Sequence, residues 1–172
     1  PPRSTPSNSS AASDVYKRQD SVASHLHDFE RIGVNFPDNC LKGIPNKSYL
    51  VDENTISSHL LYFDERDKRD DGWVETSINW EDDSSAIDFT LAQKKRDTDE
   101  LQFKTGVAVL PRCNIDAVNR LPSVCSVLAY ERAALDTNPY HGNILLRQEV
   151  PKNKMKMIAA SLALHATVIL RR

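Results

Sequence analysis

The sequence predicts an α+β domain in which a mainly antiparallel sheet of about five or six strands packs against a long C-terminal helix and one or two shorter helices. Short runs of aliphatic and aromatic residues recur between turn-forming residues, which is typical of strands. One run, residues 73–80, alternates apolar and polar side chains, as a strand with one buried face does. Residues 151–172 instead repeat apolar side chains at helical spacing, which predicts the long helix.

The first elements are short and extended. Residues 40–44 form an apolar piece that ends at the turn signal Pro45-Asn46, and residues 49–51 are extended. Residues 56–63 are rich in Leu, Tyr and Phe and predict a strand. The charged connection over residues 64–72 predicts a solvated hairpin tip, because opposite charges in water gain little by pairing.

The clearest strand covers residues 73–80. Its apolar face carries Val74, Thr76, Ile78 and Trp80. The acidic residues 81–83 and Ser84 then predict the start of a helix that runs to about Arg96, because acids at the start and bases at the end complement the helix dipole.

The second half predicts three more strands and a short helix. Residues 103–110 predict a strand, and residues 106–110 are apolar on both faces, as expected for a central position. Asn114 can cap a helix over residues 115–120, and residues 124–131 predict a strand. A last strand enters at Tyr140 and reaches Leu146.

The predicted final helix starts at Pro151, a residue suited to the first turn. Three lysines near its start oppose the helix dipole, which suggests that they face an acidic partner or ligand. Ser161 and His165 interrupt an apolar run that is already shorter than a membrane span, so no membrane partner is predicted. The residues expected to face the sheet are Met155, Ile158, Ala159, Leu162, Ala166 and Ile169.

The amino end resembles translated DNA from a sequencing library. Residues 9–19 read SSAASDVYKRQ, the in-frame translation of a transposase-type adapter, and residues 1–5 resemble a translated flow-cell primer. We therefore exclude residues 1–19 from fold reasoning as adapter-derived and disordered. Residues 20–36 are interpreted as leader or a mobile terminus, with the hypothesis of a GTG initiator at Val34, and residues 37–172 as one α+β domain.

The charge balance disfavours nucleic acid as a partner. The chain has a formal net charge of −2. The excluded segment carries more basic than acidic residues, so the remaining domain is more acidic still. It lacks the broad basic surface that binds phosphate backbones. Nucleic-acid binding therefore ranks last among the functions considered; it would use Lys152, Lys154, Lys156, Arg171 and Arg172.

Neither a metal nor a cofactor is predicted. The three cysteines form no Cys-x-x-Cys unit, so neither a disulfide framework nor a zinc ribbon is indicated, and reduced cytoplasmic thiols are expected. His25-Leu26-His27-Asp28 could begin a metal site, but no third ligand is indicated and the segment falls in the interpreted leader. The sequence contains no P-loop, Gly-x-Ser-x-Gly, His-Glu-x-x-His or dinucleotide fingerprint.

The candidate site is the polar block that precedes the last apolar segments, NPYHGNILL over residues 138–146. His141 and Asn143 would share one face of a strand, with Tyr140 on the other. The candidate ligand-binding residues are Asn138, Tyr140 and His141, because histidine titrates near neutral pH and amides both donate and accept. The candidate catalytic residues are His141, Asn143 and Cys113. Alternatively, these polar groups satisfy backbone groups where a loop crosses the sheet edge.

Three stretches, WVETSINW, GVAVLPR and NPYHGNILL, with the Ala-rich segment after them, resemble uncharacterised bacterial open reading frames of unknown function over about residues 41–172. The resemblance implies a bacterial, cytoplasmic origin and brings no activity.

The predicted function is a non-catalytic interaction or accessory protein, because no catalytic motif with strong spacing is present. An unknown protein partner is compatible with it, and the oligomeric state stays open. The alternative is a small hydrolase or transferase that uses His141 with Asn143, Cys113 or a carboxylate from residues 81–83. An enzyme predicts that these groups converge in a deep pocket, and an interaction protein predicts a dispersed set and an exposed apolar patch.

Overall fold

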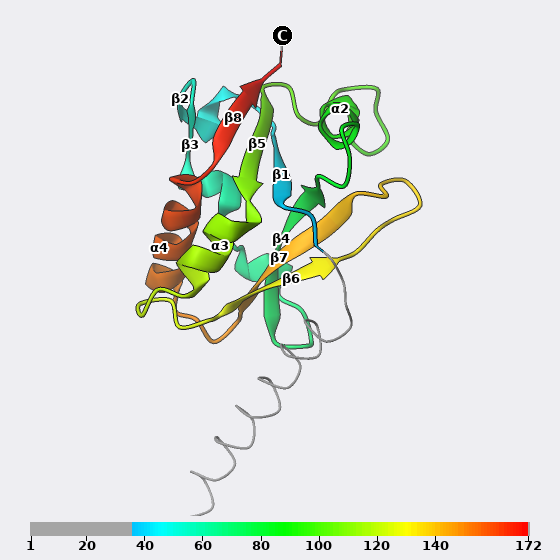
Figure 1. The fold of residues 1–172 in the computed structure, drawn as a ribbon. Coiled ribbons are helices and arrows are strands. Elements are labelled where there is room, and N and C mark those ends of the chain that lie inside the picture. The colour runs from blue at the N-terminus through cyan, green and yellow to red at the C-terminus, as the bar shows by residue number, and fades with distance from the viewer. Residues whose placement is uncertain (1–35, 172) are drawn as a thin grey trace, which may run out of the picture. The chain divides into compact units, whose positions relative to one another are not determined.

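A six-stranded antiparallel sheet forms the centre of the computed structural model, which describes residues 36–171. Its strand order is β6-β7-β4-β1-β5-β8 (Figure 1). The strands are β1 (Asn39–Ile44), β4 (Trp73–Trp80), β5 (Gly106–Pro111), β6 (Leu128–Arg132), β7 (His141–Arg147) and β8 (Thr167–Leu170). A small hairpin of β2 (Leu50–Asp52) and β3 (Thr55–Ile56) stands apart from this sheet. The predicted α+β class and the antiparallel sheet are confirmed.

Helices cover both faces of the sheet (Figure 1). The helix α3 (Arg112–Asn119) packs on α4 (Lys152–Ala163), and the Tyr130 hydroxyl of β6 hydrogen bonds to Asp116 of α3. The helix α2 (Ala86–Ala92) lies on the opposite face, where Asn79 of β4 donates to Thr90 at 2.8 Å. Alternate residues of a strand point to opposite faces. Tyr130 therefore marks the face of the sheet that α3 covers, and Asn79 marks the face that α2 covers.

Strand β4 is observed over the predicted residues 73–80. The four side chains of its predicted apolar face are all buried, and Trp80 is completely so. The Trp80 indole Nε1 donates to the Glu131 backbone oxygen at 3.1 Å, and its ring meets Tyr130 edge-on at 5.8 Å. A Cβ on Gly142 would lie 2.1 Å from this Nε1, so β7 can cross Trp80 only without a side chain there.

The predicted long C-terminal helix is wrong in its second half. Helix α4 ends at Ala163, and residues 167–170 form β8, which pairs with β5. The β-branched Thr167, Val168 and Ile169 favour a strand. The β5 edge also offers backbone groups that need partners. Ile169 is therefore 38% exposed at a sheet edge, whereas Met155 and Ile158 are buried as predicted. Within residues 36–171, no helix has the length and apolar character to cross a membrane.

The predicted strand over residues 56–63 is also wrong. Only Thr55–Ile56 is extended, and a 3-10 helix, η2 (Ser58–Leu61), follows. The Ser57 hydroxyl accepts from the His59 backbone N–H at 3.4 Å, which caps this helix. Leu60 and Leu61 are buried, and η2 packs against α4, so their hydrophobicity reflects helical rather than strand packing.

Other boundaries shift for local reasons. Helix α2 ends at Ala92 rather than near residue 96, because the chain reverses there: the Lys95 backbone N–H donates to the Glu100 oxygen, and that of Gln102 to the Gln93 oxygen, each at 2.8 Å. Strand β6 begins at Leu128 rather than 124, because Cys125 and Ser126 have φ of 61° and 54°. Helix α3 begins at Arg112, before the predicted cap. Two more 3-10 helices, η1 (Lys47–Tyr49) and η3 (Glu65–Asp67), lie in the connections.

The adapter-like residues 1–19, the interpreted leader up to residue 35 and the His25–His27 motif lie outside the described residues.

Candidate functional site

The sheet splits between two of its central strands. Strand β1 pairs with β4 only through Cys40 opposite Trp80 and Leu41 opposite Asn79. Beyond these pairs the strands separate, and a cavity of about 910 Å³ opens. We call this cavity the fork pocket. Its central walls are Lys42 and Gly43 of β1 and residues 76–79 of β4.

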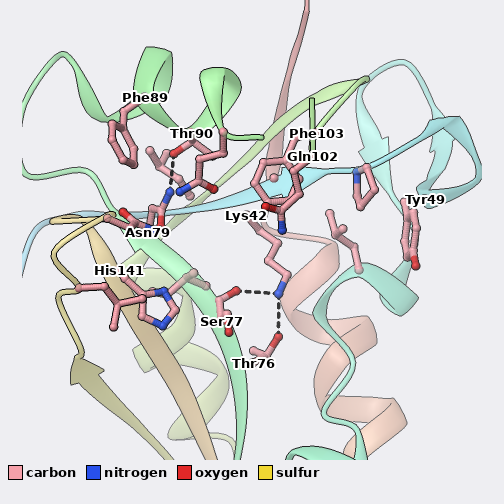
Figure 2. Close-up of a pocket in the computed structure, with 18 of the residues that line it drawn as sticks. Lys42, Tyr49, Thr76, Ser77, Asn79, Phe89, Thr90, Gln102, Phe103 and His141 are labelled. Carbon is pink, nitrogen blue, oxygen red and sulfur yellow. Dashed lines mark hydrogen bonds between the residues drawn. The ribbon is translucent and has the colours of Figure 1, made fainter. Parts of the chain in front are cut away.

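Lys42 extends from β1 into the gap (Figure 2). Its Nζ donates to the Ser77 backbone oxygen at 2.6 Å and to Thr76 Oγ1 at 3.1 Å. In a continuous sheet, a backbone N–H of β1 would pair with a β4 carbonyl such as that of Ser77. The lysine side chain therefore supplies a donor that the split removes, and this contact fixes its ammonium group in the pocket.

The Lys42 side chain is partly buried. Burial lowers the pKa of Lys42 to about 8, and the nearby Asp67 carboxylate opposes this shift. The physical cause is the loss of hydration, which disfavours the charged form. A lysine with a pKa near 8 is partly neutral at physiological pH, so this side chain can act as an ammonium donor or as an amine.

Aromatic rings and amides complete the walls. Figure 2 shows Phe103 beside Lys42, Tyr49 at one end of the pocket and Phe89 at the other. The Phe103 ring occupies the place of a Gly43 side chain, because a Cβ there would lie 2.2 Å from its Cγ. Rings with a few fixed polar groups are typical of small-molecule sites. The polar wall residues include Asn79, Gln93, Gln102 and Asn138.

His141 lies on the pocket wall (Figure 2). It is half-buried, and burial lowers its pKa, while the Glu75 and Glu131 carboxylates act in the opposite direction. A histidine with a lowered pKa is mainly neutral at neutral pH and can accept a proton. His141, one of the predicted site residues, therefore lines the same pocket as Lys42.

Asn138 also lines the pocket, but its amide has structural partners. Its Nδ2 donates to Asn79 Oδ1 at 2.9 Å, and its Oδ1 accepts from the Tyr140 backbone N–H at 3.2 Å. Asn79 in turn donates to Thr90. This chain of hydrogen bonds holds the loop before β7 and helix α2 in place. The Tyr140 hydroxyl contacts the Asp83 carboxylate at 3.1 Å, so it braces the start of α2.

Asn143 belongs to a separate polar network on the His141 face. Its Nδ2 donates to Glu131 at 2.9 Å and to Glu75 at 3.3 Å. Arg69 donates to the same Glu131 carboxylate at 2.6 Å and 3.1 Å. Asn143 is buried, and its Oδ1 has no hydrogen-bond partner among the residues that the structure describes. The network connects β4, β6 and β7 to the charged connection before β4.

Removal of Arg69 should destabilise this network. We expect Arg69→Leu to lower the free energy of unfolding by roughly 1 kcal/mol at pH 7, a figure discounted for partial solvent exposure. The Arg69 hydrogen bond is the main cause that lowers the pKa of Glu131. The loss should therefore be present above the ordinary glutamate pKa and should fade as pH falls through the lowered one. Urea unfolding of both proteins at pH 7 and pH 3 measures this, and an equal loss at both values would contradict it.

The structure does not bring Cys113 to His141. Cys113 is exposed on α3, which packs on the face that carries Tyr130. Tyr130 pairs with Ile144 of β7, whose neighbour Asn143 points the opposite way together with His141. The sheet therefore separates the thiol from the imidazole, and this geometry does not support a nucleophile and base pair.

The acidic residues 81–83 have structural partners. Glu81 accepts from Asn39 at 2.8 Å, and Asp82 pairs with Arg132 at 2.7 Å. Asp83 accepts from the Ser85 backbone N–H at 2.7 Å, beside the start of α2. The described residues contain no group of three side chains that could hold a metal ion.

One of the three lysines that were expected to face an acidic partner or ligand pairs with a carboxylate of the same chain. Lys152 Nζ lies 2.9 Å from the Glu65 carboxylate. Helix α4 is thereby joined to η3, and this contact accounts for one of the lysines at its unfavourable end.

Comparison of the chain with protein-family models, curated proteins and solved structures yields no match. The site is therefore interpreted from its own geometry. Sequence reasoning missed Lys42, although a signal was present. Lys42 is the only residue of the apolar run 40–44 that ordinarily carries a charge at neutral pH, and a charge within a central strand needs a specific partner.

Proposed function

We propose that the protein is a non-catalytic accessory protein that binds a small organic anion in the fork pocket. The observation that carries this proposal is the position of the Lys42 ammonium group inside a cavity of about 910 Å³. The size falls within the usual range of small-molecule sites.

The hydrogen-bond count at Lys42 supports a bound oxygen anion. An ammonium group has three N–H donors. Two of them are used by Ser77 and Thr76, and the third is available to a ligand in the cavity. A poorly hydrated ammonium gains more from a bound anion than an exposed one does.

The acidic residues of the pocket do not neutralise this site completely. Asp64 is held by Arg66 at 2.6 Å. Asp67 interacts with Lys42 electrostatically, but burial still dominates and the pKa of Lys42 stays low. We infer that a ligand carboxylate supplies the closer negative charge that the pocket lacks.

The aromatic walls indicate the rest of the ligand. Tyr49, Phe89 and Phe103 offer flat apolar surfaces near the lysine. An aromatic carboxylic acid matches both features, and phenyllactate is a suitable probe.

Phenyllactate is expected to raise the melting temperature of the wild-type protein and of Lys156→Met, a control on the exposed side of α4. Lys42→Met should lose most of this increase, because its side chain has similar length but no donor. A thermal-shift titration measures the effect. The proposal fails if phenyllactate has no effect on the wild-type protein, or if Lys42→Met responds equally.

The alternative function is a small hydrolase or transferase that uses His141. The specific observation in its favour is the His141 imidazole, whose pKa burial lowers, on the wall of the same pocket. Under the binding proposal, His141→Ala retains phenyllactate binding within a few-fold. A reaction that His141→Ala abolishes while binding persists would favour the enzyme instead.

We also propose a bacterial cytoplasmic origin. The described cysteines Cys40, Cys113 and Cys125 are all free thiols, which supports a reducing compartment.

A further inference from the structure

The geometry at Lys42 suits an amine as well as an ammonium group. A neutral amine has two N–H donors and one lone pair. The Ser77 carbonyl oxygen and Thr76 Oγ1 lie 2.6 Å and 3.1 Å from Nζ and can take the two donors. Both acceptors belong to β4 and Lys42 lines the fork pocket, so the lone pair is the part of the amine that is left for a ligand.

We propose that Lys42 forms an imine with the carbonyl carbon of an α-keto acid bound in the fork pocket. This inference rests on the proposed function and specifies the chemical class of its ligand. An aromatic α-keto acid combines the carboxylate, the flat ring and an electrophilic carbon, and phenylpyruvate represents this class.

The chemical step balances without a further reactant. The Nζ lone pair forms a bond to the carbonyl carbon, and one amine proton moves to the former carbonyl oxygen. The resulting carbinolamine loses water and leaves a carbon–nitrogen double bond. No electrons are transferred, so neither an oxidant nor a reductant is needed. The reverse step, addition of water, returns the free lysine and the keto acid.

The protonation state of Lys42 supports this step. Burial lowers its pKa to about 8. Lys42 is therefore neutral in about a quarter of the ligand-free molecules at pH 7.5, whereas an ordinary lysine is neutral in roughly a thousandth of them. Lower basicity makes the amine a weaker nucleophile. We therefore expect a net rate advantage of about tenfold or more over an exposed lysine.

Other titratable groups face the same pocket and enter its pH dependence. The Asp67 carboxylate raises the pKa of Lys42, and the charge of Lys42 lowers the pKa of His141. At low phenylpyruvate concentration, where the protein is mostly free of ligand, the imine-forming rate at Lys42 should rise up to about pH 8 and then level off, whereas that of an ordinary lysine should continue to rise. The remaining groups in the lining are Tyr49, His59, Tyr62, Asp64 and Lys94.

Reductive trapping tests the inference. The full chain is incubated with phenylpyruvate and cyanoborohydride, which reduces an imine to a stable secondary amine, and the modified peptide is identified by mass spectrometry. Phenyllactate, the matched α-hydroxy acid, has no carbonyl and serves as the chemical control. The protein controls are Lys42→Arg, Lys42→Met and Lys156→Met.

The expected result is one adduct at Lys42, formed about tenfold or more faster than at any exposed lysine and retained in Lys156→Met. Lys42→Arg and Lys42→Met should show only the slow background. Two failures are distinguishable. If phenyllactate and phenylpyruvate both raise the melting temperature but no adduct forms at Lys42, the imine inference is wrong and anion binding stands. If phenyllactate does not bind the wild-type protein, the proposed function fails, and the imine inference that rests on it fails too.

Discussion

Replacement of Trp80 by alanine is expected to lower the free energy of unfolding by about 3 to 5 kcal/mol. Trp80 is completely buried, and its indole joins β4 to β6 through the Glu131 backbone oxygen. The substitution leaves a large cavity and removes the indole hydrogen bond. The loss is comparable with the whole stability of a small domain, about 5 to 15 kcal/mol. Urea unfolding at pH 7 measures it.

Trp73 and Gly142 provide matched controls. Trp73 is only partly buried and interacts with Arg147 at 5.5 Å, so Trp73→Ala should cost about 1 kcal/mol or less. Gly142→Ala should destabilise the wild-type protein by about 1 to 3 kcal/mol, because its Cβ meets the Trp80 indole and the Glu131 backbone. In the Trp80→Ala background this cost should shrink. Equal losses for Trp80→Ala and Trp73→Ala would contradict the packing described for β4.

Substitution of Lys42 by methionine is expected to stabilise the protein near neutral pH. An ordinary lysine keeps its proton to about pH 10.4. Folding lowers the pKa of Lys42 to about 8, so the unfolded state binds more protons between these values. The burial cost of the ammonium group is therefore fully present below about pH 8 and fades as pH rises through the unfolded value. We expect Lys42→Met to gain about 1 to 2 kcal/mol at pH 7, after allowance for partial exposure and two lost hydrogen bonds.

The pH dependence distinguishes this explanation from simple hydrophobic gain. Urea unfolding of wild-type and Lys42→Met protein at pH 7 and pH 10 should show a large difference at the lower pH and a small one at the higher pH. Lys156→Met, on the exposed side of α4, should differ little from wild type at both. A constant difference across the range would show that the charge of Lys42 is not the cause. Functional groups are often retained at a cost in stability.

The fold was predictable where local pattern and tertiary context agree. Residues 73–80 alternate cleanly and form β4 with the predicted ends. Residues 167–170 continue the helical spacing of the segment before them, so a helix was predicted there. That prediction was wrong, because these residues pair with the edge of β5 and form β8. Residues 56–63 are rich in Leu, Tyr and Phe, which predicted a strand, but residues 58–61 pack against α4 as a 3-10 helix. Pairing across the sheet decides these segments, and a single sequence does not display it.

The candidate site was predictable only in part. The block at residues 138–146 does bring His141 and Asn138 to a pocket, because the strand and its preceding turn were correctly placed. The other half of the pocket depends on where β1 and β4 separate, and no local pattern marks that point. Lys42 acquires its properties from this separation. The same residue in a continuous sheet would lack both the cavity and its contact with the Ser77 carbonyl.

Titration of Lys42 by NMR tests the central claim most directly. The ε-methylene signal, observed in protein with isotope-labelled lysine and assigned with Lys42→Arg, reports the protonation of this one side chain. We predict a midpoint near pH 8 without ligand, and a higher midpoint with phenyllactate, because a bound anion favours the ammonium form. A midpoint shared with the exposed lysines and unchanged by phenyllactate would contradict the account of the fork pocket as an anion site.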